Sequence, residues 1–274
     1  MRPSARRPAA AGPKKTRAAP QLSEDEKAFV RSLVIYEDAD ILALNKPPGL
    51  SSQGGRGQVH TLDELLFAFA KPSGVKPRLV HRLDRDTSGV ILTARSQPAA
   101  AFLGKALMRR RFRKTYLAIV TPCAPAPPAG LIEAPLRRDE SGREAFMRVC
   151  DPGHPDAEAA LTRYRTLAEG PASALVEASP QTGRMHQIRV HLASIGRPIA
   201  GDARYGGALT LAGEPVPRLM LHAFALEFPH PGGELLRITA APPADFVAIA
   251  REAGLDLPQT EAFSETPRHR IRPA

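Results

Sequence analysis

Apolar residues along the chain fall into short runs separated by Gly, Pro and Asp, a pattern typical of strands and short helices. Residues 33–38 (LVIYED) and 41–47 (ILALNKP) predict two short strands joined by an Asp-rich turn. Residues 89–94 (GVILTA) form an almost wholly apolar run and predict a buried strand. Residues 98–110 predict a helix, which is followed by a strand over residues 114–120 (KTYLAIV). The first half of the chain therefore mixes both kinds of element.

The second half of the chain favours an antiparallel sheet, because short alternating segments are joined by Gly, Pro and Asp turns. The predicted strands are residues 131–136, 145–150, 161–167, 174–178, 219–228 and 235–240. Gly196 and Pro198 end a predicted helix over residues 185–195, and a last helix follows Pro242. A chain of 274 residues that mixes such elements suits one α/β or α+β domain.

Two capping signals mark predicted helix starts. The SEDE sequence at Ser23 caps a short helix near the beginning of the folded part. Thr61 and Glu64 form the two ends of a capping box before an amphipathic helix over residues 61–70. We therefore expect ordered structure to begin at about Ser23.

The two ends of the chain have the composition of disordered segments. Residues 1–20 contain six basic residues and no acidic residue, and they bury too little apolar surface to offset their conformational entropy. We expect disordered basic tails at residues 1–22 and 258–274 and one folded domain at residues 23–257. We interpret the tails as solubilising segments, the alternative being a weak RNA-contacting arm.

The charge balance indicates a polyanionic partner. Of the 274 residues, 38 are Lys or Arg and 28 are Asp or Glu, which gives a net charge of +10. Neutralised phosphates release counterions, so a basic surface favours nucleic-acid binding. An ordinary basic surface without such a partner explains the same numbers.

Several classes of protein are disfavoured by what the sequence contains. Cys123 and Cys150 form no C-x-x-C pair, which argues against a zinc ribbon, an iron–sulfur site or a disulfide framework and fits a reducing cytoplasm. No apolar run approaches the roughly 20 residues of a membrane span. Neither a Rossmann glycine fingerprint nor a Walker loop occurs, so we expect no nucleotide cofactor. We expect a cytoplasmic protein.

The densest group of reactive side chains is the segment HRLDRDTSG, residues 81–89, directly before the predicted buried strand. Polar loops at the mouth of a sheet are where catalytic groups are usually mounted. Asp84 and Asp86 are candidates for nucleophile or base, and Arg82 and Arg85 for phosphate binding. The alternative is a salt-bridged turn in which the hydroxyl residues serve as local caps.

A second group lies in residues 182–206 (TGRMHQIRVHLASIGRPIAGDARYG). Four basic side chains fall on a predicted helix start, and these are Arg184, His186, Arg189 and His191. Cations near a helix N-terminus need anionic partners, and Asp84 is a candidate partner for a buried Arg189. The two histidines are five residues apart, whereas helical metal pairs are four apart, so hydrogen-bonded histidines are the preferred interpretation over a metal site.

A third group is the basic run RRRFRKTYLAIV, residues 109–120. Arginines that alternate with aromatic side chains suit an RNA surface, where cations meet phosphates and a ring stacks on a base. A solvated helix end followed by an ordinary strand, with Tyr116 as a packing residue, is the alternative.

These three groups together resemble the RluA family of pseudouridine synthases. HRLDRDTSG resembles the family's catalytic motif, KTYLA its tyrosine motif, GRMHQIRVHLASIGRPIAGDARYG its arginine motif and RLMLHAFALEF a later strand motif. The resemblance spans about residues 33–246. It implies an α+β domain with a mixed, largely antiparallel sheet, flanking helices and a central RNA-binding cleft, so that residues 23–257 form the catalytic domain.

The resemblance also implies the reaction and the partners. We expect isomerisation of specific uridines to pseudouridine in structured RNA, either ribosomal or transfer RNA, by a monomer that needs no metal and no nucleotide cofactor. Two departures from the family pattern stand out. The first is Met185, where Thr, Ser or Lys is more usual, and the second is an N-terminal segment too short to fold as an RNA-binding module.

Carried over by position, the resemblance assigns roles to individual residues. Asp84 is the nucleophile or base, Tyr116 stacks on the target base, and Arg189 pairs with the catalytic carboxylate. Arg82 fills the gap left by the flipped nucleotide, and Leu221 packs beneath the site. The remaining substrate-binding candidates are His81, Thr87, Arg184 and His186.

Two other functions compete with this one. The first is a non-catalytic RNA-binding or ribosome-assembly factor that uses the same basic cleft. The second is a metal-dependent hydrolase built on His81, His186 and His191, which a chelator would inactivate.

Overall fold

The computed structural model describes residues 20–54, 60–141 and 144–257. The predicted tails lie outside these residues except for positions 20–22. The helices are α1 (Glu24–Ser32), α2 (Leu62–Leu65), the 3-10 helix η1 (Leu66–Phe69), α3 (Gln97–Met108), α4 (Gln187–Ser194) and α5 (Ala244–Glu252). None of these described helices combines the length and the apolar character that a membrane crossing requires.

The described strands are short and numerous. The first seven are β1 (Val34–Glu37), β2 (Ile41–Lys46), β3 (Arg78–Leu79), β4 (Ser88–Ala94), β5 (Arg113–Val120), β6 (Ala129–Glu133) and β7 (Leu136–Ser141). The others are β8 (Glu144–Val149), β9 (Leu161–Gly170), β10 (Ser173–Pro180), β11 (Thr210–Leu211), β12 (Glu214–Pro215), β13 (Leu221–Pro229) and β14 (Leu235–Thr239).

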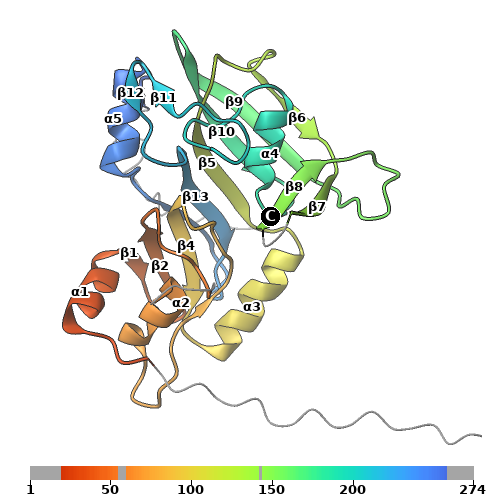
Figure 1. Cartoon of the computed structure of the whole chain (residues 1–274). Helices are drawn as coiled ribbons and strands as arrows, with labels where there is room; N and C mark the ends of the chain where they lie inside the picture. The colour runs from red at the N-terminus through yellow and green to blue at the C-terminus, as the bar shows by residue number, and fades with distance from the viewer. Residues whose placement is uncertain (1–19, 55–59, 142–143, 258–274) are drawn as a thin grey trace, which may run out of the picture.

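Ten of these strands form one sheet, in the order β1-β2-β4-β13-β5-β10-β9-β6, with β14 beside β13 and β3 beside β4. The β4–β13 pair is parallel, and the other pairs of this sheet are antiparallel. The expected α+β fold with a mixed, largely antiparallel sheet is therefore confirmed. Figure 1 shows β1, β2 and β4 with α1 to α3 in the lower part of the molecule, and β5, β6, β9 and β10 with α4 and α5 in the upper part.

The parallel junction between β4 and β13 joins the two parts of the sheet. Ser88 and Gly89 lie opposite His222 and Ala223, and the Ser88 hydroxyl is 2.9 Å from His222 Nδ1. Gly89 has φ +116°, and a Cβ there would lie 2.1 Å from the Ala223 carbonyl oxygen. Only glycine allows this close approach of two backbones. The junction holds the polar loop that precedes β4 at the centre of the sheet.

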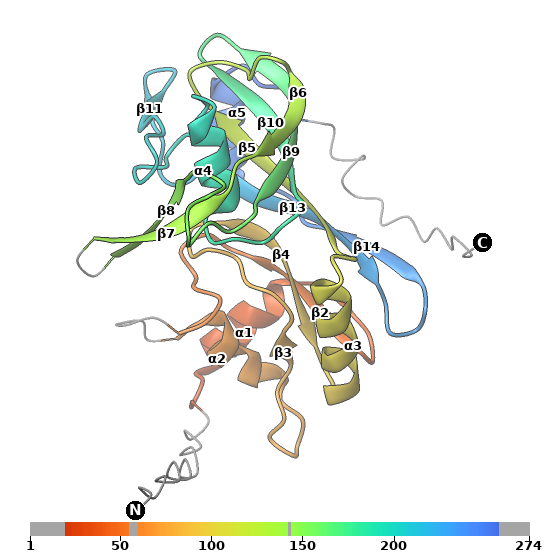
Figure 2. The same cartoon turned by 90° about the vertical axis from the view of Figure 1, so that its right-hand side faces the viewer.

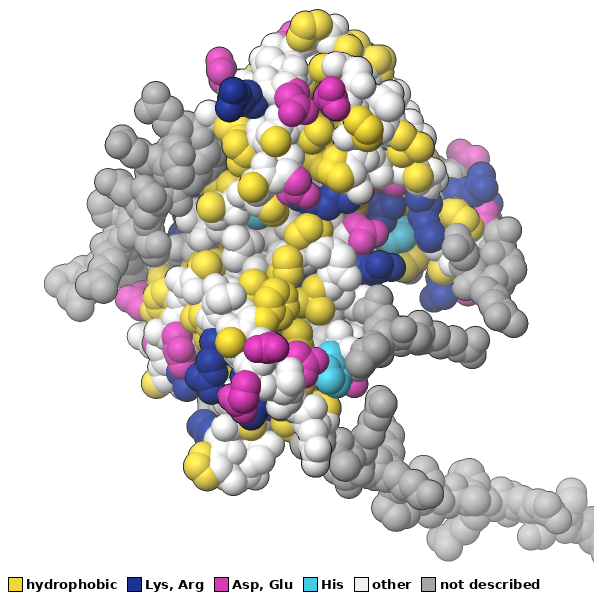
Figure 3. Space-filling model, turned by 60° about the vertical axis from the view of Figure 1, so that its left-hand side comes forward, with side chains coloured by type: hydrophobic (Ala, Val, Ile, Leu, Met, Phe, Trp, Pro, Cys, Tyr) yellow, Lys and Arg dark blue, Asp and Glu magenta, His cyan; other side chains and the backbone are white. Residues whose placement is uncertain are grey.

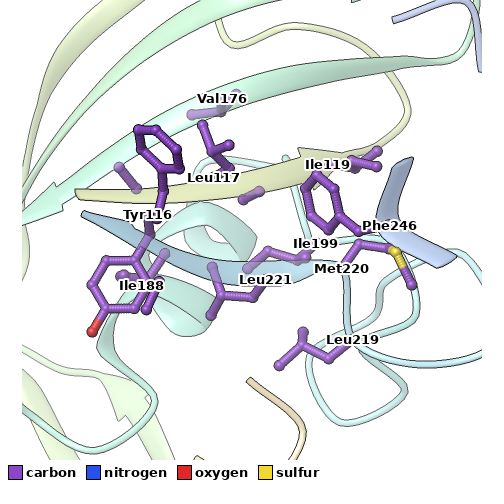
Figure 4. Packing of buried hydrophobic residues seen from close by; sticks show 14 of the residues in the cluster. Tyr116, Leu117, Ile119, Val176, Ile188, Ile199, Leu219, Met220, Leu221 and Phe246 are labelled. Carbon is purple, nitrogen blue, oxygen red and sulfur yellow. The ribbon is translucent and has the colours of Figure 1, made fainter. Parts of the chain in front are cut away.

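Apolar side chains pack on both faces of the sheet. One cluster contains Leu117, Ile119 and Val176 with Phe246 of α5. A second, on the other face, contains Val90 and Leu92 of β4 with Leu103 of α3. Figure 4 shows the first cluster, in which the side chains of β5 and β13 meet Ile188 of α4. Helices thus pack against both faces of the sheet.

The predictions that depend on residues close together in the sequence are the ones that hold best. Both capping boxes form as predicted, at Ser23–Glu26 and at Thr61–Glu64. The helix expected over residues 61–70 is shorter than predicted, because one turn of α-helix tightens into η1, which buries Leu66. The strand expected over residues 131–136 is also wrong, since it divides between β6 of the main sheet and β7.

The divided segment builds a separate hairpin. β7 and β8 pair only with each other as strands of a two-stranded sheet. In Figure 2 this hairpin projects from the body of the molecule beside α4. The chain leaves the main sheet at residues 134–135, and β8 of the hairpin packs against α4.

Candidate active site

A groove between the two parts of the sheet leads into a deeper pocket. The groove has a volume of about 780 Å³ and the pocket about 110 Å³. Eight of the nine residues proposed from the sequence line the pocket, namely Arg82, Asp84, Thr87, Tyr116, Arg184, His186, Arg189 and Leu221, while the ninth, His81, lines the groove. Figure 3 shows Lys, Arg, His and acidic side chains gathered beside the indentation between the two parts.

The centre of the pocket is an ion pair between distant parts of the chain. Asp84 lies in the loop before β4, and its Oδ2 is 3.6 Å from Arg189 Nη1 of α4. The Asp84 side chain keeps 33% of its surface exposed, whereas that of Arg189 keeps 12%. A carboxylate with a cation on its inner side and an open outer side is positioned to meet a bound molecule.

Asp202, which sequence reasoning missed, is the closer partner of Arg189. Its two carboxylate oxygens accept hydrogen bonds from Arg189 Nε and Nη2 at 2.7 and 2.8 Å. The backbone N–H groups of Arg204 and Tyr205 also donate to Oδ1, at 3.2 and 3.3 Å. This bidentate pair is nearly buried and fixes the plane of the guanidinium, so Nη1 is left to face Asp84.

His186 flanks Asp84 on the other side. It has φ +52° and precedes α4, so His186 and Arg184 lie outside the helix on which they were predicted. The Tyr205 hydroxyl accepts a hydrogen bond from Met147 N–H and is also hydrogen-bonded to His186 Nδ1 at 2.8 Å. The other ring nitrogen, Nε2, lies 3.8 Å from Asp84 Oδ2. Burial lowers the pKa of His186, an effect that Asp84 opposes.

Lys46, also missed by sequence reasoning, holds the Asp84 loop from behind. This lysine is fully buried at the end of β2, and its ammonium donates to the carbonyls of Pro47, Leu50 and Arg85 at 2.8, 2.8 and 3.0 Å. Burial lowers its pKa to about 7, and the nearby carboxylates of Asp86 and Asp84 oppose that shift. The bond to Arg85 ties the Asp84 loop to the end of β2, while the other two bonds fix the ammonium in the segment that follows β2.

Apolar and aromatic side chains form the inner wall of the pocket. Tyr116 on β5 lies beside Ile188 of α4 with its hydroxyl directed away from the apolar cluster (Figure 4). Leu221 pairs with Ala118 across the sheet and so faces the same side as Tyr116. Burial raises the pKa of the Tyr116 phenol, and Asp84 adds to the effect. The wall is a neutral ring and a leucine, which suit the face of a flat base.

The other predicted residues have distinct surroundings. Arg82 is exposed at the rim, whereas Arg184 is held by Glu158, with Nη1 2.5 Å from the Glu158 carboxylate. Thr87 is buried, and its backbone N–H donates to the Asp84 carbonyl at 3.2 Å. His81 is also buried, and its Nε2 accepts the Leu92 N–H at 3.1 Å. Burial lowers the pKa of His81 to about 3, so this ring is a neutral support of the loop.

The histidines do not form a metal-ligand set. Both nitrogens of His191 are used inside the fold, because Nδ1 accepts from the Thr162 hydroxyl at 2.8 Å and Nε2 donates to the Ala134 carbonyl at 3.0 Å. Within the described residues, no group of three His, Cys, Asp or Glu side chains could hold a metal ion. The hydrolase hypothesis therefore lacks the ligands on which it was based.

The signals for the two missed residues were present but unspecific. Asp202 lies in the segment GRPIAGDARYG, and Lys46 lies in the segment NKPPGL. A buried polar residue needs partners, but its spacing along the chain does not reveal that it is buried. Only the folded positions of the loops around Arg189 and Asp84 show what these two residues do.

Comparison with known proteins identifies the arrangement. Residues 40–194 match the family model for RNA pseudouridylate synthase, which covers the Asp84 loop, β5 and α4. The chain belongs to this family. Its members isomerise uridine to pseudouridine in RNA, and the protein is therefore an RNA pseudouridine synthase of the RluA family. Family membership also decides against the purely RNA-binding alternative.

Relatives and solved structures agree with the assignment. The chain is 42% identical over 221 residues to the ribosomal large subunit pseudouridine synthase C of Salmonella typhimurium, covering 78% of this chain and 67% of that protein. It is 39% identical over 215 residues to the mitochondrial RNA pseudouridine synthase 4 of Arabidopsis thaliana, covering 71% of this chain and 45% of that protein. The structure of human RNA pseudouridylate synthase domain containing 4 superposes with a TM-score of 0.73 at 26% identity, covering 86% of this chain and 99% of that one.

Proposed function

We propose that Asp84 is the catalytic carboxylate, held by Arg189, and that the pocket receives a uridine turned out of its RNA. The observation that carries this proposal is the 3.6 Å ion pair of Asp84 and Arg189 at the mouth of a pocket walled by Tyr116 and Leu221. The two residues come from a loop and a helix 105 positions apart in the chain. An ion pair that only stabilised the surface would not need residues so far apart.

The reaction breaks the bond from N1 of uracil to C1′ of the ribose, turns the base and joins C5 to C1′. Asp84 acts in its charged form, either attacking C1′ or removing a sugar proton. The positive charge of Arg189 favours that form and aims the carboxylate. The base stays in the pocket while it turns because Tyr116 and Leu221 contact its faces. The hydrogen on C5 leaves as a proton to solvent and N1 takes up a proton, so the product is an isomer of the substrate.

The surrounding residues prepare the RNA and the loop. Turning the uridine out of a stack costs a few kcal/mol. Arg82, exposed at the rim, fills the vacancy and offsets part of that cost. Thr87, His81 and Lys46 hold the loop, while Arg184 and His186 border the path of the nucleotide.

We further propose that the substrate is a uridine of large-subunit ribosomal RNA rather than transfer RNA. The relatives named for the large ribosomal subunit are 42% identical over 78% of this chain, which supports a common substrate. We also propose a cytoplasmic location, because the bacterial relatives are named for the large ribosomal subunit and bacterial ribosomes lie in the cytoplasm. We propose that it works as a monomer, since one chain supplies every residue of the site.

The test compares large-subunit ribosomal RNA from cells with and without the enzyme. Carbodiimide treatment followed by primer extension stops reverse transcription at pseudouridines. We expect at least one stop that depends on the enzyme and returns when the purified protein modifies the unmodified RNA. Enzyme-dependent stops in transfer RNA alone would contradict the proposed substrate and leave the family activity intact.

A further inference from the structure

Lys114 lies between the groove and the pocket and has no role in the reaction described above. It lines both spaces, together with Arg82 and Asp84. On β5 it stands two residues before Tyr116, so both side chains extend from the same face of the strand, about 7 Å apart. A cation is thus placed one strand repeat from the ring that contacts the base.

The ammonium of Lys114 has no hydrogen bond or ion pair within the described parts of the chain. Three other cations of the site do have partners within the protein: Arg189 binds Asp202, Lys46 binds three carbonyls and Arg184 binds Glu158. Arg82, which also lines both spaces, is exposed to solvent and keeps its hydration. Lys114 is half-buried, and burial lowers its pKa. An uncompensated cation in such surroundings costs stability, because it has lost part of its hydration without gaining a partner.

Arg113, the residue before Lys114 on β5, lies in different surroundings. Arg113 points to the other face of β5, where its side chain is 85% exposed and lies 3.5 Å from Glu227. A lysine that served only solubility would occupy such an exposed position. Lys114 instead faces the cleft, where the anion that would compensate it must come from outside the protein.

We propose that Lys114 binds the phosphodiester group that flanks the everted uridine. A phosphate is one sugar away from its base, which matches a cation one strand repeat from Tyr116. The contact forms only when RNA is bound, so the stability lost in the free enzyme is recovered in the complex. This inference rests on the proposed function, in which the pocket receives the uridine.

The test measures RNA binding by Lys114→Met and by the matched control Arg113→Met, which removes the same charge from the opposite face of the strand. The probe is a fluorescent oligouridylate, titrated over a range of salt concentrations. Each phosphate contact contributes about 0.7 to the slope of log affinity against log salt for a single strand. We expect Lys114→Met to bind about tenfold more weakly with a slope smaller by about one contact. Arg113→Met should stay within about twofold of the wild-type affinity.

A thermal melt separates a binding role from a structural one. We expect the melting temperature of Lys114→Met to equal or exceed that of the wild type, because an unpaired cation is removed. Lys114→Arg should keep the wild-type salt slope. An unchanged slope in Lys114→Met, or a lower melting temperature, would overturn the inference. Tritium release by the wild type from ribosomal RNA tests the proposed function separately. If no tritium is released, the proposed function fails, but the salt slopes measured with oligouridylate still show whether Lys114 binds a phosphate.

Discussion

Replacing Asp202 by Asn removes a negative charge from beside Arg189 while the shape of the side chain is kept. The amide nitrogen of Asn would face the guanidinium, donor against donor, so at least one of the bonds at 2.7 and 2.8 Å is lost. Arg189 is then free to turn away from the plane in which its Nη1 meets Asp84. The variant therefore disturbs Asp84, the proposed catalytic carboxylate, without replacing it.

The expected size of the effect follows from the burial of the pair. Breaking a buried ion pair by removing one partner costs about 3–5 kcal/mol. Asp84 remains 3.6 Å from Arg189 and compensates part of the charge, so we expect the lower limit, about 3 kcal/mol. In a domain of this size that lowers Tm by roughly 6–12 °C. A misplacement of the catalytic group by about 1 Å lowers kcat about 100-fold.

The assay is tritium release from RNA labelled at C5 of uridine, measured at a temperature at which the variant is folded. We expect kcat to fall about 100-fold and RNA affinity to change only several-fold, because Arg189 lies inside the pocket rather than along the groove. Asp245→Asn is the matched control, since Asp245 holds Arg218 through two bonds of 2.6 and 2.7 Å and lines neither the groove nor the pocket.

The control should lose stability but keep its kcat. If Asp202→Asn releases tritium at the wild-type rate, Arg189 is not positioned by Asp202 and the reasoning fails. Equal losses of kcat in both variants would also refute it, because the loss would then reflect a general loosening of the fold.

Three further changes have definite expected outcomes. Asp86→Asn should keep tritium release within about fivefold of the wild type, because its half-exposed side chain lies 3.7 Å from Arg85 at the surface. A loss as large as that of an Asp84 variant would indicate that Asp86 is the catalytic carboxylate. Arg82→Ala should slow the modification of a paired uridine at least tenfold more than that of a uridine in an unpaired oligonucleotide, because filling the vacancy offsets a flipping cost of a few kcal/mol, and equal effects on both RNAs would contradict this role. Burial lowers the pKa of His222 from 6.5 to about 4, so the unfolded chain takes up the proton first on acidification. The stability from this group is complete above pH 6.5 and is lost as the pH falls to 4, by about 3 kcal/mol, and the buried His81 adds to the loss seen in urea titrations. A urea midpoint that does not change between pH 7 and pH 4.5 would rule this out.

Local chemistry explains which parts of the fold could be predicted. The capping boxes at Ser23 and Thr61 depend on residues three positions apart, and both formed as predicted. The run GVILTA was predicted to be buried because it lacks a polar face, and every residue of β4 is buried. The break between β6 and β7 was missed because the choice of strand partner depends on distant segments rather than on the run itself.

The candidate site shows the same division. The residue types and their order predicted the lining of the pocket, since eight of the nine candidates meet there. The supporting contacts could not be predicted, because Arg189 had two possible acidic partners and the closer one, Asp202, lies beyond the end of α4. Lys46 needed the fold as well, since its acceptors include a carbonyl 39 positions away.

Asp84→Asn tests whether the carboxylate beside Arg189 performs the chemistry. The variant keeps the shape of the side chain, and carbodiimide primer extension on ribosomal RNA treated with purified protein measures the product. We expect no pseudouridine stop from the variant, RNA affinity within several-fold of the wild type, and an unchanged melting profile. A full-strength stop from Asp84→Asn would show that another group carries out the isomerisation.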